Sequence, residues 1–404
     1  MISRKEYIEK VKPFIGKDLV KVFTGIRRSG KSSLLELLKD TLIAEGSDAS
    51  LFYSLNLEEL RYQAMPALDI HDEIKAFCDK NSEKSYIFLD EVQEINNWER
   101  LVNSLRAMTN ADIYITGSNS NLLSGELATH LAGRYIEIPV FPLSFKEIYD
   151  WNIKNNSSVV DGDKLFQQYL RVGGFPFIHA SFLEEQAALS YLRDIYQSIM
   201  LKDVVARHQV RDVELLNRIF LYLLSNTGQT FSGKSLSDYL KSERRQLSLE
   251  TLYNYIAYAE EAFLVYLSSR YDIRGKRILS YQEKIFLADI GIREAVYGNN
   301  ERDISQILEN IVYLELIRRG YKVKIGRFDA QEIDFVADRR GEKIYFQVAY
   351  ILADENTIDR EFSVLEKIND NFPKYVLSLD KFDRSRNGIL HKNIIDFLLE
   401  YVSA

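Results

Sequence analysis

The 404-residue chain is poor in the residues that mark disulfide-bonded, flexible and membrane-spanning proteins. Its one cysteine, Cys78, excludes a disulfide framework and a cysteine-rich zinc module, and agrees with a reducing compartment. Its 19 glycines and 6 prolines are too few for long flexible linkers. No uncharged apolar run reaches the roughly 18 residues of a membrane-spanning helix, and the opening MISRKEYIEK lacks the apolar core of a secretory signal. We therefore expect a cytoplasmic protein without a membrane partner.

The composition is that of a folded protein, with 46% hydrophobic and 27% charged residues. At roughly 100–200 residues per domain, the length predicts two to four domains. A net charge of −7 argues against general polyanion binding. Residues 201–280 nevertheless hold 12 basic and 9 acidic residues, an excess of +3 that leaves −10 for the rest of the chain. A local basic face is therefore compatible with the composition.

Residues 25–32, GIRRSGKS, have the spacing GxxxxGKS/T between a predicted strand at 18–24 and a helical pattern. Glycines let the backbone wrap a phosphate, and exposed N–H groups with the helix N-terminus supply partial positive charge. Lys31 is expected on the β- and γ-phosphates of ATP, and the Ser32 hydroxyl on Mg²⁺. The predicted phosphate-binding set is Gly25, Arg28, Ser29, Gly30, Lys31, Ser32 and Ser33.

Two acids, Asp90 and Glu91, end a near-continuous apolar strand predicted at residues 85–89. Ligands of open α/β sheets bind at the carboxyl ends of the strands. We expect Asp90 to orient Mg²⁺ or its water shell, and Glu91 to polarise the attacking water. The alternative is that the pair caps the helix that begins near Asn97.

Polar residues at two further strand ends are candidate catalytic groups. Ser118 or Asn119, after the predicted strand at 112–116, could sense the γ-phosphate, although a helix N-cap explains them nearly as well. Arg134 enters a strand predicted at 135–140 and could neutralise charge on the nucleotide of its own or a neighbouring subunit. A surface ion pair is the alternative for Arg134.

Several motifs together resemble one family: GIRRSGKSS, DEVQ, ITGSNS, LAGRY with PLSF, and YLRVGGFP at residues 169–176. The chain is similar over nearly its whole length to prokaryotic AAA-type ATPases whose C-terminal half is a domain called DUF4143. The resemblance implies an α/β P-loop ATPase of the additional-strand, catalytic-Glu class, followed by a winged-helix region and a restriction-endonuclease-like domain. We expect these three parts at residues 1–180, 181–288 and 289–404.

The middle of the chain agrees with a winged helix-turn-helix. Helices are predicted at 213–224, 235–241 and 248–264, and a hairpin from the strands 265–271 and 278–287. Candidate contacts to double-stranded DNA are Arg244, Arg245, Arg274, Lys276 and Arg277. Equally, the hairpin could pack the ATPase against its neighbour while these charges are solvated.

The last part has the pattern of an endonuclease-like fold without its full set of catalytic residues. A helix is predicted at 305–319, and strands at 321–325, 332–336 and 344–348. In such folds acids bind Mg²⁺ and a carboxylate-x-lysine pair helps to activate water. The candidate residues are Glu309, Asp334 and Gln347, but Ala349 stands where the lysine is expected. We therefore predict a degenerate, non-cutting domain and keep an active nuclease as the less favoured hypothesis.

These features predict Mg²⁺-dependent ATP hydrolysis that drives rearrangement of C-terminal domains bound to DNA or protein. The alternatives are a nucleotide-gated protein-interaction scaffold that does not bind DNA, and an ATP-dependent nuclease. Self-assembly is expected if Arg134 acts between subunits. No motif that reads a guanine base is evident, which favours ATP over GTP.

Overall fold

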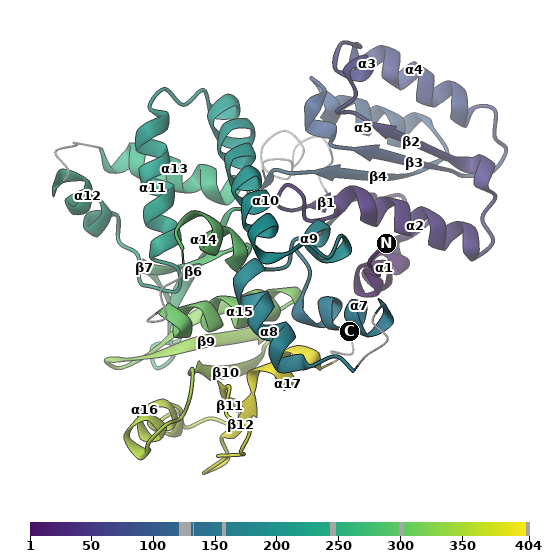
Figure 1. The fold of residues 1–404 in the computed structure, drawn as a ribbon. Coiled ribbons are helices and arrows are strands. Elements are labelled where there is room, and N and C mark those ends of the chain that lie inside the picture. Colours follow the sequence, from purple (N-terminus) through teal and green to yellow (C-terminus); the bar gives the residue numbers. More distant parts are fainter. Residues whose placement is uncertain (121–130, 132, 156–158, 243–247, 299–302, 401–404) are drawn as a thin grey trace. The chain divides into compact units, whose positions relative to one another are not determined.

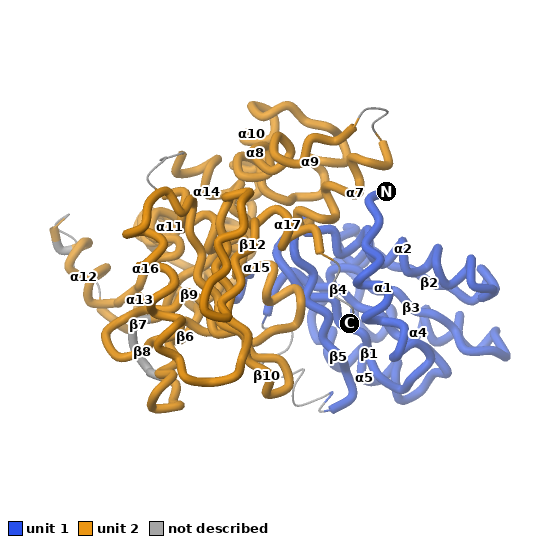
Figure 2. Tube along the Cα trace, turned by 90° about the horizontal axis from the view of Figure 1, so that it is seen from below, with its two compact units in different colours: residues 1–142, 261–263 blue, residues 143–260, 264–404 orange. Residues whose placement is uncertain are grey.

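The computed structural model describes residues 1–120, 131, 133–155, 159–242, 248–298 and 303–400. The chain divides into two compact units (Figure 2): residues 1–142 with 261–263, and residues 143–260 with 264–404. The expected domain boundaries near residues 180 and 288 do not coincide with this division. Residues 143–180 cluster with the second unit, and residues 264–288 share a sheet with the C-terminal part. In the described part of the chain, no helix is long and apolar enough to cross a membrane.

The first unit is built on a five-stranded parallel sheet of order β2-β3-β4-β1-β5 (Figure 1). Strand β4 lies between the strand that leads into the phosphate-binding loop and the strand that ends in the two acids, as the additional-strand class of P-loop ATPases requires. The predicted P-loop fold is confirmed. The strands are β1 (Val20–Thr24), β2 (Phe52–Asn56), β3 (Ser85–Asp90), β4 (Ala111–Gly117) and β5 (Tyr135–Pro139).

Alternation along the strands supplies each sheet face with its own apolar core. Val20 and Val22 pack with α4 and α5, whereas Phe23 packs with α1 and α2 on the other face. Burial of both faces explains why the three central strands, β1, β3 and β4, read as nearly continuous apolar runs. The helices are α1 (Lys5–Val11), α2 (Lys31–Ala44), α3 (Leu60–Gln63), α4 (Ala67–Cys78) and α5 (Trp98–Met108), with the short turns η1 (Lys12–Phe14), η2 (Ala49–Leu51) and η3 (Val92–Glu94).

The second unit combines a helical part with a seven-stranded mixed sheet of order β12-β11-β10-β9-β8-β6-β7. The strands are β6 (Val265–Asp272), β7 (Arg277–Leu287), β8 (Lys322–Phe328), β9 (Gln331–Arg339), β10 (Glu342–Val348), β11 (Lys374–Ser378) and β12 (Leu390–Asn393). The helices are α7 (Phe145–Asn155), α8 (Gly162–Val172), α9 (Pro176–Ala180), α10 (Glu185–Ser198), η5 (Ile199–Ala206), α11 (Val213–Ser225), α12 (Gly233–Ser242), α13 (Leu249–Glu261), α14 (Ile290–Val296), α15 (Ile304–Arg318), α16 (Glu355–Glu366) and α17 (Ile394–Leu399).

The predicted hairpin exists, but it is part of the larger sheet. Strands β6 and β7 pair in antiparallel fashion, and β6 also pairs in parallel with β8. The three predicted helices before it are α11, α12 and α13. The hydroxyl of Ser232 accepts a hydrogen bond from the backbone of Ser235 at 3.1 Å, and that of Ser248 accepts one from the backbone of Thr251 at 3.1 Å, so each serine caps the helix that follows it. The hairpin thus extends the sheet instead of standing free as a wing.

Candidate functional site

The loop between β1 and α2 carries the phosphate-binding motif, and its backbone requires glycine at two positions. Gly25 has a φ of +146°, and a Cβ built on it would lie 2.1 Å from the carbonyl oxygen of Val140. Gly30, which precedes the first residue of α2, has a φ of +97°. Left-handed backbone of this kind favours glycine because other residues carry a Cβ. The loop conformation therefore depends on both motif glycines.

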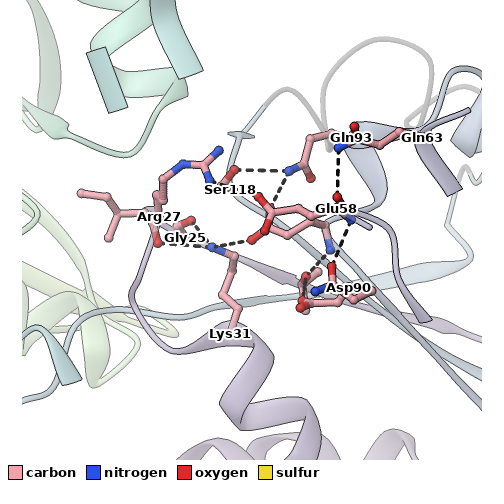
Figure 3. A network of polar contacts seen from close by, with 12 residues as sticks. Gly25, Arg27, Lys31, Glu58, Gln63, Asp90, Gln93 and Ser118 are labelled. Atoms are coloured by element: carbon pink, nitrogen blue, oxygen red, sulfur yellow. Dashed lines mark hydrogen bonds and ion pairs between the residues drawn. The ribbon is translucent and has the colours of Figure 1, made fainter. Parts of the chain in front are cut away.

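Lys31 is the first residue of α2, and its ammonium points back into the loop (Figure 3). Its Nζ donates hydrogen bonds to the carbonyl oxygens of Gly25 and Ile26 at 3.1 and 3.2 Å, and lies 3.6 Å from Oε1 of Glu91. The side chain is 2% exposed. A positive charge held here by the loop itself is placed to meet an anion in the loop.

Asp90 and Ser32 come together from two different elements. Asp90 ends β3, and Ser32 lies in the first turn of α2. The hydroxyls of Thr116 and Ser32 donate hydrogen bonds to the Asp90 carboxylate. Burial raises the pKa of Asp90, while these two hydrogen bonds oppose the rise. A carboxylate and a hydroxyl in mutual reach are oxygen ligands of the kind that Mg²⁺ takes in nucleotide sites.

Glu91 sits on a strained turn beside Lys31. Its φ is +53°, a value uncommon for a residue with a side chain, and its N–H donates to Oγ1 of Thr116 at 2.8 Å. Burial tends to raise the pKa of Glu91, but the charge of Lys31 and a hydrogen bond from Gln93 outweigh it, so the pKa lies below its usual value. Glu91 is therefore an ionised carboxylate in a buried position, which suits a group that orients and polarises water.

Gln93 and Thr116 are two residues of this network that the sequence reasoning did not single out. The Gln93 amide donates to the carboxylate of Glu91 and, at 3.3 Å, to the hydroxyl of Ser118. Thr116 joins the side chain of Asp90 to the backbone of Glu91. Gln93 lies in the motif DEVQ and Thr116 in the motif ITGSNS. Their positions close to the candidate residues Glu91 and Ser118 could therefore have identified them. Ser118 is 0% exposed and thus belongs to the polar network of the site.

These residues fit a magnesium–nucleotide. The hydroxyl of Ser29, in the loop, is buried and has no hydrogen-bond partner among the described residues. Buried polar groups are normally paired, so an unpaired hydroxyl in this place agrees with a polar ligand. Arg28 is exposed in the same loop, Ser32 and Ser33 are exposed in the first turn of α2, and Asn119 is buried after β4.

Arg134 is the predicted catalytic residue that the structure does not bring to the loop. It precedes β5, whose first residue Tyr135 pairs with Val20 at the beginning of β1. The loop starts at Gly25, five residues along β1, which corresponds to about 16 Å at roughly 3.3 Å per residue. Arg134 is exposed at the amino ends of the strands and does not reach the loop of its own chain. A contact with a neighbouring subunit stays a prediction.

The candidate DNA contacts are only partly described. Arg244 and Arg245 lie outside the described residues. Arg274 pairs with Asp329 at 3.0 Å, and Arg277 lies 3.6 Å from Asp272, although both arginine side chains are 74% exposed. Together with Arg327 these four residues line a cavity of about 390 Å³, and the neighbouring Lys276 is exposed on the same turn. The basic residues of this turn are thus partly neutralised by acids.

Glu309, Asp334 and Gln347 do converge, from α15, β9 and β10, around a cavity of about 510 Å³. The Gln347 amide oxygen accepts a hydrogen bond from the backbone of Asp334 at 3.0 Å, and its Nε2 donates to Oε2 of Glu361 at 3.1 Å. Val348 donates its N–H to Oδ2 of Asp334 at 2.8 Å. Both ends of the glutamine amide are engaged, so Gln347 links β9 to α16 within the protein.

The lysine missing from β10 has a counterpart on β7. Nζ of Lys284 lies 2.9 Å from Oε2 of Glu309, 2.7 Å from Oε1 of Glu332 and 4.0 Å from Oδ1 of Asp334. Burial alone would lower the pKa of Lys284, but these three acids raise it above its usual value. Burial raises the pKa of Glu309, and it raises the pKa of Asp334 well above its usual value. The described residues contain no group of three or more His, Cys, Asp or Glu side chains arranged to hold a metal ion.

Comparison with known protein families finds two matching segments of the chain. Residues 17–149 match a family described as AAA domain, and residues 163–303 match a domain of unknown function, DUF8612. The name DUF4143 stays a prediction, since these matches do not include it.

Two curated relatives and two solved structures illustrate the similarity. An uncharacterized protein of Haemophilus influenzae is 40% identical over 403 residues, which cover 99% of each chain. Uncharacterized protein MJ1544 of Methanocaldococcus jannaschii is 30% identical over 366 residues, 86% of this chain and 78% of the relative. The Aeropyrum pernix ORC1 protein in complex with DNA matches with 13% identity and a TM-score of 0.36 over 73% of this chain and 92% of that chain. A Thermotoga maritima RuvB mutant matches with 16% identity and a TM-score of 0.34, over 66% and 89%.

The extent and identity of the Haemophilus influenzae match, together with the P-loop, the additional strand and the acid pair, place the chain in the same family as that relative, with an AAA domain at residues 17–149.

Proposed function

We propose that the first unit binds ATP with Mg²⁺ and hydrolyses it. The observation that carries the proposal is that Lys31, Ser32, Asp90 and Glu91 meet at the carboxyl ends of β1 and β3, with direct contacts between Lys31 and Glu91 and between Ser32 and Asp90. A phosphate-binding loop alone would support binding. The ionised, buried Glu91 beside it supports hydrolysis.

In this mechanism each residue has one task. The loop amides and the Lys31 ammonium bind the phosphates, and Ser32 and Asp90 hold the metal. When bound, Mg²⁺ would offset negative charge on the phosphates. Glu91 orients the water that attacks the γ-phosphorus, the bond to the bridging oxygen breaks, and ADP, phosphate and a proton to solvent result. Gln93 and Thr116 position Glu91 through its side chain and its backbone.

The cap alternative for the acid pair has less support. The helix after Asp90 and Glu91, α5, begins at Trp98, and its N-cap residue Asn97 makes no side-chain hydrogen bond. Neither acid caps α5, whereas Glu91 contacts Lys31 directly. The pair therefore contributes to the site at the loop.

Two substitutions test the proposal. Lys31→Ala is expected to abolish tight ATP binding, because it removes the buried charge in the loop. Glu91→Gln is expected to keep binding and to lose turnover, because the amide keeps the shape and loses the negative charge that polarises water. Binding is measured with a fluorescent ATP analogue and turnover as released phosphate. Native turnover by the Glu91 variant would remove Glu91 from the mechanism.

We further propose that hydrolysis drives rearrangement of the second unit, which binds DNA or a protein. Exposed arginines on the turn between β6 and β7 support DNA, and the acids paired with them support a protein scaffold equally. ATP turnover with and without duplex and single-stranded DNA, at two salt concentrations, separates the two. Stimulation that falls steeply with salt indicates DNA, whereas nucleotide-dependent assembly without DNA affinity indicates a scaffold.

The endonuclease-like part is proposed to be non-cutting. Lys284 pairs with Glu309 and lies 4.0 Å from Asp334, the acids that a nuclease would use for Mg²⁺, and the Gln347 amide makes internal hydrogen bonds through both its oxygen and its nitrogen. The test is plasmid DNA incubated with the chain, ATP and Mg²⁺ or Mn²⁺. Cleavage that Asp334→Ala abolishes would establish the nuclease alternative.

A further inference from the structure

The phosphate-binding loop contains an arginine, Arg27, whose side chain is held inward. Its side chain is 12% exposed, and its Nη1 lies 3.3 Å from Oε1 of Glu58, which follows β2. Arg28, the next residue, is exposed. Figure 3 shows the Arg27 guanidinium beside Ser118, on the side of the loop where Lys31 and the acids meet. Two neighbouring arginines of one motif thus have different surroundings.

Arg27 lies beside the network that holds Glu91, the group that Lys31 contacts. Its guanidinium is next to Ser118 in Figure 3, and the Gln93 amide donates both to the Ser118 hydroxyl, at 3.3 Å, and to the Glu91 carboxylate. A guanidinium beside this network also lies close to an anion that contacts Lys31, since Nζ of Lys31 is 3.6 Å from Oε1 of Glu91. The geometry therefore puts a second full positive charge at the end of the loop where the γ-phosphate is expected.

Glu58 keeps Arg27 in place without blocking the site. The Glu58 side chain is 43% exposed and makes one contact of 3.3 Å with Arg27. The backbone of Glu58 is fixed, because its N–H donates to Oδ1 of Asn56 at 3.0 Å and its carbonyl accepts from Gln63 at 3.1 Å. Partly exposed ion pairs of this kind are weak, whereas a guanidinium binds phosphate through strong charge-assisted hydrogen bonds. A nucleotide phosphate would thus compete with Glu58 for the Arg27 guanidinium.

We propose that Arg27 contacts the γ-phosphate in its own chain and neutralises the charge that develops there during hydrolysis. This inference rests on the proposed ATPase function and names a residue for a task that Arg134 cannot perform within one chain. Charge in phosphoryl transfer spreads over the oxygens of the transferred group, so a fixed guanidinium stabilises the transition state more than the bound substrate. Arg27 would be a catalytic residue, and Glu58 a residue that positions it.

The first test compares Arg27→Ala with Arg27→Lys. Removal of the guanidinium is expected to lower kcat by roughly 10²–10³-fold, while the affinity for the fluorescent ATP analogue changes little. The lysine variant should recover part of the rate, because it restores charge without the planar fork. Trapping of ADP with aluminium fluoride, a mimic of the transition state, should be lost in Arg27→Ala although ADP alone still binds. A normal kcat or normal trapping in Arg27→Ala would overturn the inference.

The second test separates an arginine that acts in its own chain from one supplied by a neighbour. Each arginine variant is mixed with an excess of Lys31→Ala chains, which have intact arginines but lack the loop lysine. Arg27→Ala should stay inactive in the mixture, because each loop uses its own Arg27. Recovery of Arg27→Ala activity would refute the own-chain contact. Arg134→Ala is the matched comparison, and an intersubunit role for Arg134 predicts that its activity recovers.

The failures of the two proposals can be told apart. The proposed ATPase function fails if the unaltered chain does not bind ATP, or if it binds ATP but releases no phosphate. In either case Arg27 has no reaction to assist. If the unaltered chain turns over ATP and Arg27→Ala does so at the same rate, the ATPase function stands and only the role of Arg27 fails. Binding of the fluorescent analogue by Arg27→Ala shows that its loop is folded. If the alanine variant does not fold, the turnover of Arg27→Lys is compared with that of the unaltered chain instead.

Discussion

Replacement of Lys284 by methionine should strongly destabilise the second unit. The Lys284 side chain is 6% exposed, and its ammonium lies 2.7–2.9 Å from carboxylate oxygens of Glu309 and Glu332, with Asp334 at 4.0 Å. Methionine keeps much of the length and apolar body of the side chain but leaves these acids without their shared cation. Removing one partner of a buried ion pair costs about 3–5 kcal/mol, chiefly because the remaining charge is buried without compensation. We expect a loss of that size in the free energy of unfolding.

The expected loss depends on pH in a defined direction. A carboxyl whose pKa is higher in the folded than in the unfolded chain stabilises the fold at low pH, and this contribution disappears as pH rises through the folded value. Burial already raises the pKa of Glu309 and Asp334, and Lys284 opposes that rise. Without Lys284 both values go up further. The variant should therefore be destabilised less at pH 5 than at pH 8.

The assay uses the two tryptophans of the chain, Trp98 in the first unit and Trp151 in the second. In a Trp98→Phe background, urea unfolding followed by fluorescence reports on the second unit through Trp151. Lys322→Met, an exposed lysine on β8 of the same sheet, is the matched control and should change stability by less than about 0.5 kcal/mol. A loss for Lys284→Met below about 1 kcal/mol, or one independent of pH, would refute the ion-pair reasoning.

Three further outcomes are expected. Gly25→Ala should abolish ATP binding and lower the thermal stability of the first unit, because the added Cβ meets the Val140 carbonyl oxygen at 2.1 Å; normal binding by this variant would show that the loop tolerates a side chain there. Burial lowers the pKa of His179 to about 4. As pH falls, the His179 imidazole is therefore protonated in the unfolded chain before it is protonated in the folded one. The free energy of unfolding of the second unit should decrease by about 3 kcal/mol between pH 7 and pH 4. His179→Gln should flatten that part of the urea-unfolding profile, and an unchanged profile would mean that His179 does not cause it. Gln93→Ala should reduce kcat more than ATP affinity, because Gln93 touches Glu91; an equal effect on both would make its role structural.

The sequence by itself determined the local parts of the molecule. The phosphate-binding loop could be identified because its glycines, lysine and serine act within eight consecutive residues. The central strands β1, β3 and β4 were predictable because burial on both faces demands continuous apolar runs, and β3 and β4 end where polar residues begin. The helices that begin after Ser232 and Ser248 are likewise local, because each serine hydroxyl caps its helix through a backbone N–H three residues away. In each case the physical determinant lies within a few residues of the feature.

Only the tertiary structure decided which distant residues meet. Parallel pairing of β5 with β1 puts Arg134 at the amino ends of the strands, away from the loop, and no local pattern reveals the pairing. Lys284 reaches Glu309 and Asp334 because β7 and β9 belong to one sheet beside α15, although the lysine precedes both acids by a long stretch of chain. The inward orientation of Arg27 likewise depends on Glu58, which follows β2. Strand order and packing fix these contacts, because side chains from separate elements meet only once the sheets have assembled.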